Sequence, residues 1–177
     1  LMNQIDRQGL IARVLDYVQI DSDTGNEAKM AQRIIKDLTD LGCVVTPDDV
    51  RQAAMTDGCN VYATLPGDPG LFPMLFSAHM YTVVPCLGVR PVVCDDGYIR
   101  SDGTTVLGGD DKLGICAIME ALKAVKAAPH RTIEAVFTVR EARGMYGSKH
   151  PDYSRPQSKR AIVLDSSGRP AKITTGA

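Results

Sequence analysis

The stretch Leu107-Gly108-Gly109-Asp110-Asp111-Lys112 predicts a carboxylate held at the start of a helix. Its two glycines give the backbone conformational freedom, and two adjacent acidic residues follow them. Directly afterwards, apolar residues recur at helical spacing from Leu113 to Leu122. Asp is a common helix N-cap, and the helix dipole stabilises a negative charge there by about 0.3–1 kcal/mol. Taken alone, the stretch favours Asp110 as a capping residue, and its surroundings decide whether it does more.

The composition predicts a globular domain with a sizeable core. Of the 177 residues, 44% are hydrophobic and 23% are charged. Twenty basic and twenty-one acidic residues leave a net charge of −1 without a basic cluster, which argues against nucleic acid and membrane as partners. No apolar run reaches the roughly 18 residues of a spanning helix, and the first residues lack the pattern of a signal peptide. We therefore expect a cytoplasmic location.

The cysteines favour reduced thiols. They are odd in number and include no Cys-x-x-Cys pair, which is untypical of a disulfide framework or a structural zinc site. The five are Cys43, Cys59, Cys86, Cys94 and Cys116. Cys86 and Cys94 flank a predicted hairpin arm and could approach each other, so a functional pair stays open as an alternative.

Hydrophobic periodicity predicts strands that alternate with helices. We expect helices over 5–18, 24–41 and 113–127, and strands over 43–46, 60–65, 74–78, 132–139 and 161–164, with a loop over 47–58. Thr24 and Glu27 match a Thr-x-x-Glu capping box for the second helix, and Gly42 is a natural stop. Asp95-Asp96-Gly97 predicts a hairpin turn. The pattern indicates an α/β fold with a mixed, mostly parallel sheet flanked by helices.

Metal-ligating residue types follow several of these strands. His79, Glu141 and Asp165 each come at or just after a strand end, and Asp110 lies on a loop that enters a helix. Ligands of open α/β sheets collect at the carboxyl ends of strands. An imidazole with carboxylates suits zinc, cobalt or manganese, and such an ion can assist hydrolysis. The residues alone leave a second interpretation open, in which the histidine is structural and the carboxylates are solvated or cap helices.

Four motifs carry a resemblance to a known family. They are residues 79–85 (His-Met-Tyr-Thr-Val-Val-Pro), 96–105, 107–112 and 137–141 (Phe-Thr-Val-Arg-Glu). In order and spacing they resemble the cocatalytic zinc metallopeptidases of the peptidase T (tripeptide aminopeptidase), carboxypeptidase and aminoacylase family, from the first predicted helix to beyond Asp165. The resemblance implies a zinc exopeptidase-like catalytic domain that hydrolyses the N-terminal peptide bond of short peptides.

The resemblance also implies a role for each site residue. The family holds two zinc ions, with Asp110 at the position of the bridging ligand. His79 and Asp165 match the other ligands of one ion, and Glu141 matches the general base.

Two positions depart from the family pattern. Tyr81 stands where the family has an Asp that orients the histidine, and Ala142 stands where a second Glu binds the second ion. We therefore expect at most one zinc here, bound weakly at a degenerate active site, with little or no peptidase turnover. A remnant that binds peptides or a partner without hydrolysis is the alternative. A phosphate-binding loop is disfavoured, because no Gly-Lys-Ser/Thr follows the glycines.

We expect residues 1–177 to form a partial catalytic domain. The family's smaller lid or dimerisation domain and its C-terminal catalytic segment, with a late His ligand of the second ion, are expected to lie outside these residues. The resemblance leaves open a homodimer of the full-length parent.

Overall fold

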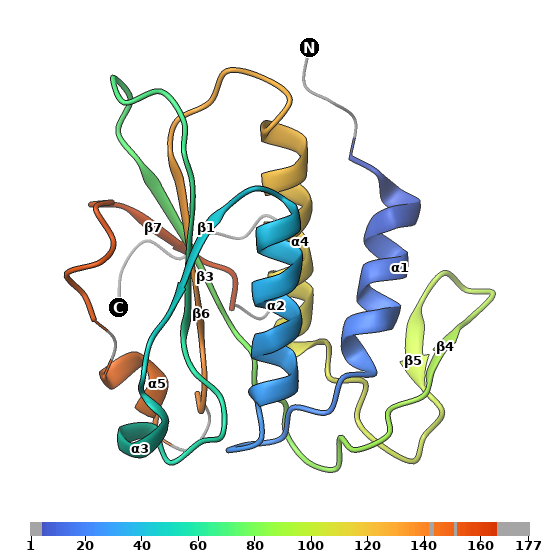
Figure 1. Ribbon diagram of the computed structural model, residues 1–177. Helices are drawn as coiled ribbons and strands as arrows, with labels where there is room; N and C mark the ends of the chain where they lie inside the picture. The colour runs from blue at the N-terminus through green and yellow to red at the C-terminus, as the bar shows by residue number, and fades with distance from the viewer. Residues whose placement is uncertain (1–4, 142–143, 151, 166–177) are drawn as a thin grey trace.

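The computed structural model describes residues 5–141, 144–150 and 152–165, and a five-stranded sheet lies at its centre (Figure 1). The elements in chain order are α1 (Arg7–Val18), α2 (Ala28–Asp40), β1 (Val44–Pro47), α3 (Arg51–Ala54), β2 (Val61–Leu65), β3 (Met74–His79), β4 (Pro91–Val93), β5 (Ile99–Ser101), α4 (Gly109–Val125), β6 (Ile133–Thr138), α5 (Tyr146–Lys149) and β7 (Ala161–Val163). Strands and helices alternate along much of the chain, as the hydrophobic periodicity predicts.

The strand order β1-β2-β6-β3-β7 gives the mixed sheet that the sequence predicts. Strands β6, β3 and β7 are parallel neighbours, whereas β1 and β2 run antiparallel to the strands beside them. The predicted hairpin contributes nothing to this mixture, because β4 and β5 form a separate two-stranded sheet. In the register of the parallel strands His79 lies opposite Thr138, so the carboxyl ends of β3 and β6 meet at one edge.

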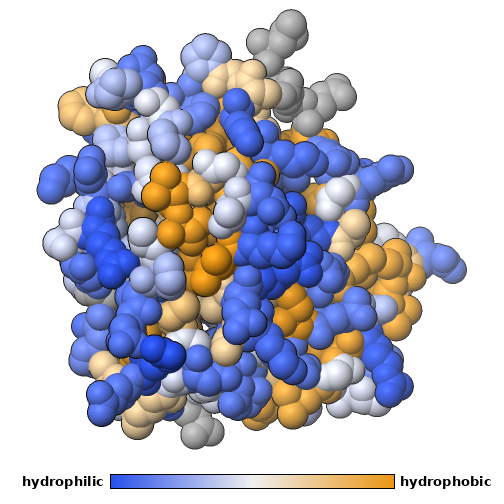
Figure 2. Space-filling view, in the orientation of Figure 1, coloured by the Kyte–Doolittle hydropathy of each residue, from blue (hydrophilic) through white to orange (hydrophobic). Residues whose placement is uncertain are grey.

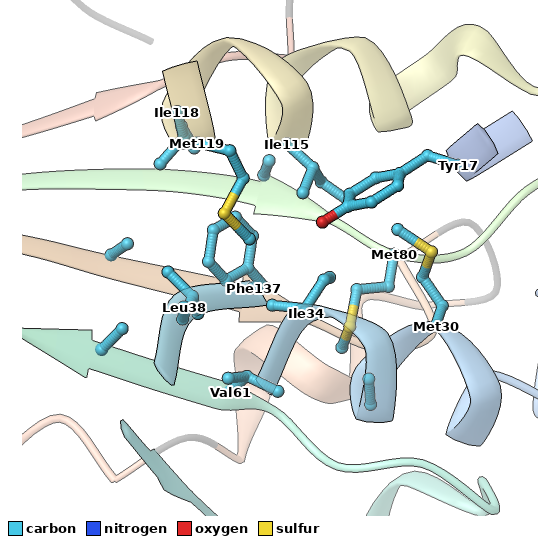
Figure 3. Close-up of a cluster of buried hydrophobic side chains, with 14 of the residues drawn as sticks. Tyr17, Met30, Ile34, Leu38, Val61, Met80, Ile115, Ile118, Met119 and Phe137 are labelled. Atoms are coloured by element: carbon cyan, nitrogen blue, oxygen red, sulfur yellow. The ribbon is translucent and has the colours of Figure 1, made fainter. Parts of the chain in front are cut away.

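Three helices cover one side of the sheet (Figure 1). Helix α2 packs over β1 and β2, α4 packs over β3 and β6, and α1 packs against α4. Figure 3 shows the buried side chains between these layers, among them Tyr17, Ile34, Ile115, Met119 and Phe137. Each fully buried apolar side chain of this size stabilises the fold by about 1.5–3 kcal/mol.

The other side of the sheet is covered by the segment that leads into β7. Glu134 of β6 is buried there and accepts hydrogen bonds from the backbone N–H groups of Gln157 (2.8 Å) and Ser158 (2.9 Å). The Arg155 guanidinium lies over the Tyr62 ring, 4.9 Å from its centroid. Such cation–π contacts contribute about 0.5–1 kcal/mol at exposed sites.

Two local predictions are wrong. The loop predicted over 47–58 contains the short helix α3. The Thr-x-x-Glu motif is not a capping box: Glu27 is itself the N-cap of α2, its side chain makes no capping bond, and Asp57 Oδ1 accepts from Ala28 N (2.8 Å) instead. The predicted stop is confirmed, since α2 ends at Asp40 and Gly42 follows with φ +85°.

The thiols, the surface and the helices each add one observation. All five cysteines are free, with Cys86 Sγ directed at Thr82 O and Cys94 Sγ at Val92 O, so the pair left open by the sequence is not formed. Figure 2 shows apolar surface where the β4–β5 hairpin projects on the right of the view; Val92, Val93 and Tyr98 are exposed there. None of the described helices has both the length and the apolar character needed to cross a membrane.

Candidate metal centre

The candidate centre lies at the carboxyl ends of the parallel strands. His79 is the last residue of β3, and Asp165 lies two residues after the end of β7. A hydrogen bond from Leu164 N to Ser77 O (2.9 Å) continues the pairing of these strands toward Asp165. Asp110 approaches the same edge from the start of α4. The sheet therefore brings together three of the side chains that the sequence singles out.

The start of α4 is shaped so that Asp110 faces the site. Asp110 (φ −86°, ψ 114°) and Asp111 (φ −109°, ψ 29°) are non-helical, and the peptide bond between them is cis. Asp111 Oδ1 accepts a hydrogen bond from Gly114 N (3.2 Å), a typical N-cap contact. Capping therefore falls to Asp111, and the interpretation of Asp110 as a capping residue is wrong.

Three ligand-type side chains converge in space. His79 Nε2 lies 3.2 Å from Asp110 Oδ1 and 4.0 Å from Asp165 Oδ2, and one ligand atom of each residue lies within 4.8 Å of those of the other two. The His79 side chain is 5% exposed, whereas those of Asp110 and Asp165 are 83% and 37% exposed. The two carboxylates border an open cavity of about 580 Å³. The group thus has a buried nitrogen at its base and carboxylate oxygens facing the cavity.

The backbone at Tyr81 fixes the orientation of the His79 imidazole. Tyr81 O lies 3.1 Å from His79 Nδ1, and a carbonyl oxygen can only accept a hydrogen bond. With Nδ1 donating to this carbonyl, Nε2 of the neutral imidazole keeps the lone pair that a metal requires. The Tyr81 ring also contacts the imidazole, with 5.4 Å between the ring centroids. The resemblance assigns this orienting role to an Asp side chain, but here a carbonyl performs it.

Acidic charge is concentrated around the cavity. The pKa of Asp111 is raised to about 8, chiefly by burial and to a smaller extent by the neighbouring carboxylates of Asp165 and Asp110, while hydrogen bonds from the backbone of His79 and Gly114 act to lower it. Repelling carboxylates at one place favour a bound cation. One imidazole nitrogen and two carboxylates also match the three protein ligands typical of catalytic zinc. The donor set therefore fits one zinc ion.

Comparison with known proteins places the chain in a family. Residues 60–172, more than half of the chain, match peptidase family M28. The chain belongs to that family. It is also 38% identical, over 98% of its length, to the uncharacterized protein YqjE of Bacillus subtilis (strain 168).

Solved structures of related peptidases share the fold of this M28 chain. A tripeptidase from Staphylococcus aureus subsp. aureus Mu50 superposes with a TM-score of 0.90 and 36% identity over 94% of the chain. The aminopeptidase PepT from Bacillus cereus ATCC 10987 superposes with a TM-score of 0.89 and 40% identity over 93%. The M28 chain spans less than half of each relative: 47% of the B. subtilis protein and 45% and 44% of the two structures.

The other predicted site residues, Glu141 and Ala142, are not part of this three-residue group. Glu141 follows β6 by three residues, is half-buried and is not part of the group formed by His79, Asp110 and Asp165. Its backbone carbonyl accepts a hydrogen bond from Met145 N (2.8 Å). Ala142 lies outside the described residues, so its predicted effect on a second ion stays a prediction.

Sequence reasoning missed the buried side chains that support this region. Glu27 and Asn60 are fully buried and accept hydrogen bonds from the backbone just before Glu141. The only signal was the acidic residue of the Thr-x-x-Glu motif, for which a local cap was a sufficient explanation.

Proposed function

We propose that the chain carries the metal-binding part of a zinc-dependent exopeptidase that hydrolyses the N-terminal peptide bond of short peptides. The observation that carries the proposal is the convergence of His79 Nε2 with the Asp110 and Asp165 carboxylates beside an open cavity. The substrate class is taken from the related tripeptidase and aminopeptidase.

Each residue has a distinct task in the proposed site. His79, Asp110 and Asp165 would hold one zinc ion, for which cobalt or manganese could substitute. When bound, zinc would supply a Lewis acid that activates water and polarises the scissile carbonyl. Glu141 accepts the proton of the attacking water and returns it to the departing amine. Tyr81 contributes its carbonyl oxygen, which holds the imidazole in the required tautomer.

The proposal is limited to one ion and low turnover. Of the side chains that the resemblance assigns to a second ion, residues 1–177 supply only Asp110, because Ala142 replaces the second Glu. A methyl group cannot coordinate a cation. The same observation favours the second candidate function, a non-catalytic protein that binds peptides or a partner and holds at most one metal.

Zinc stoichiometry and a tripeptide assay test the proposal together. After zinc saturation and removal of excess metal, mass spectrometry should find one zinc per chain. Two zinc ions per chain would overturn the proposal of a single zinc site. A protein without bound zinc would overturn the proposal of a zinc-dependent function. With one zinc bound, release of the first residue from a tripeptide should depend on a free amino terminus and should fall at least tenfold in Glu141→Gln with unchanged zinc content. Tight tripeptide binding without any release would favour the non-catalytic candidate.

A further inference from the structure

Among the described residues the buried carboxylate of Glu27 has no cationic partner, and it accepts three hydrogen bonds. Oε2 accepts from Gly25 N (3.1 Å) and from the Thr56 hydroxyl, while Oε1 accepts from Arg140 N (3.0 Å). The residue is fully buried. A buried carboxylate is tolerated only where such bonds replace its hydration, so its position is set by these three donors.

The backbone that Glu27 holds is in an unusual conformation. Arg140 has φ +49°, a left-handed value that residues other than glycine seldom adopt. Such a residue persists where its surroundings fix it from several sides. Here Glu27 binds its N–H, and the guanidinium donates to Ala54 O (3.0 Å) and Met55 O (2.8 Å). The next residue along the chain is Glu141, so the direction of that residue depends on this turn.

A second buried side chain holds the residue before Arg140. Asn60 Oδ1 accepts from Val139 N (3.0 Å), and Asn60 Nδ2 donates to Gly147 O and Asp48 Oδ2, both at 2.9 Å. Two consecutive N–H groups beyond the end of β6 are thus bound by side chains and not by the sheet.

The loop that contains Glu27 also contacts two segments of the metal centre, those that carry His79 and Asp110. Ser22 O accepts from Thr82 N (2.8 Å), three residues after His79. Ile20 O accepts from Lys112 Nζ (2.6 Å), two residues after Asp110. Residues 20–27 therefore bind the segments that carry His79, Asp110 and Glu141, and Glu27 provides the link to Glu141.

From these contacts we infer that Glu27 is a positioning residue for Glu141: its carboxylate fixes the left-handed turn at Arg140 and thereby directs the Glu141 side chain. The inference rests on the proposed role of Glu141 as general base. It does not require Glu27 to touch substrate or metal.

Strand β6 offers a matched control for the test. Glu134, near the start of the strand, is also a buried carboxylate that accepts from two backbone N–H groups and one hydroxyl, those of Gln157 and Ser158. In either glutamate, substitution by Gln replaces one acceptor oxygen with an amide that faces an N–H donor. Glu27→Gln and Glu134→Gln therefore impose the same chemical change at opposite ends of one strand.

The zinc-loaded full-length protein is compared with both variants by amide hydrogen exchange and tripeptide kinetics. In Glu27→Gln, exchange at Arg140 should accelerate at least tenfold and kcat should fall at least tenfold, with KM and zinc affinity within twofold. In Glu134→Gln, exchange should accelerate at Gln157 and Ser158, with kcat within twofold. The inference would be overturned if Glu27→Gln left both the amide exchange at Arg140 and kcat unchanged. It would also be overturned if both variants lost kcat equally.

A further readout separates this inference from the proposed function. If the unsubstituted protein binds zinc but shows no turnover, the enzymatic proposal fails. The positioning role of Glu27 is then tested by NMR titration of the Glu141 side chain. Its midpoint should move by at least half a pH unit in Glu27→Gln and stay in place in Glu134→Gln; no movement would overturn the inference. If Glu27→Gln does not fold, Glu27→Asp, which keeps the charge but shortens the reach, takes its place with the same expected outcomes.

Discussion

The two ends of strand β6 are held in the same way, but only one end faces the candidate metal centre. At each end a buried glutamate accepts from two backbone N–H groups and a hydroxyl: Glu134 near the start and Glu27 beyond the end. At each end a glycine also packs where a Cβ would overlap the backbone. That Cβ would lie 2.4 Å from a carbonyl oxygen at Gly67 and 2.0 Å from one at Gly147.

The ends differ in how far the sheet itself holds the chain. Before β6 the backbone stays paired, because Asp68 and Arg131 form a parallel bridge. Beyond Thr138 the N–H groups of Val139 and Arg140 are bound by side chains instead. The segment carrying Glu141 therefore takes its shape from buried polar groups distant in sequence. Substitutions beyond the end of β6 should alter the metal centre, whereas matched substitutions near the start of β6 should alter only the stability of the fold.

The largest contrast is expected between two histidines at these opposite ends. His79→Ala removes the only nitrogen of the three-ligand group and should weaken zinc binding by more than about 100-fold, beyond the 10–100-fold typical of losing an outer partner. His130→Ala, three residues before β6, should leave zinc affinity unchanged. Competition with a chelator measures both. Equal losses in the two variants would mean that zinc binds elsewhere.

The two close-packed glycines give the next contrast. Gly67→Ala and Gly147→Ala should each lower the free energy of unfolding by about 1–3 kcal/mol, because the added methyl forces the backbone apart. Urea denaturation measures this loss. Gly147→Ala displaces the backbone at Val139, so it alone should also accelerate amide exchange at Arg140. If Gly67→Ala did so equally, the two ends would not be independent.

The same division separates what the sequence could predict from what it could not. The strands, the main helices and the meeting of His79, Asp110 and Asp165 follow from local periodicity and from the rule that parallel strands end at one edge. The role of Glu27 does not, because Arg140 is 113 residues away and a local cap explained the motif. Nor does the orienting contact at Tyr81, because a backbone carbonyl leaves no trace in residue identity.

Tyr81 gives a smaller contrast within the centre. Tyr81→Asp restores the carboxylate of the family pattern and should raise zinc affinity, measured by chelator competition, by up to about tenfold. This is the lower end of the usual range for such partners, because the carbonyl of residue 81 already orients the imidazole. Asn has the size of Asp but no charge, so Tyr81→Asn should not raise zinc affinity. An equal rise in both variants would mean that the bulk of the phenol, and not the missing charge, limits binding.

The smallest expected effect concerns the hydrophobic core, which is common to both ends of β6. Cys116 of α4 is buried, and burial raises its pKa from the usual 9.0 to about 12. The folded state therefore holds this proton more tightly than the unfolded state, so the stabilisation is complete below pH 9 and is lost as the pH rises toward 12.

Relative to Cys116→Ala, the metal-free protein should lose about 0.8 kcal/mol of unfolding free energy between pH 7 and 9.5 in urea denaturation. The cavity left by the substitution adds an offset that does not vary with pH. A difference that stays constant over this range would mean that the thiol titrates normally in the folded state. Cys116 lies in α4 and takes no part in the hydrogen bonds of Glu27 or Glu134, so the alkaline loss should accelerate exchange at Arg140 and Gln157 alike. Selective acceleration at Arg140 would mean that the end facing the centre follows the stability of the core more closely than the end held by the sheet.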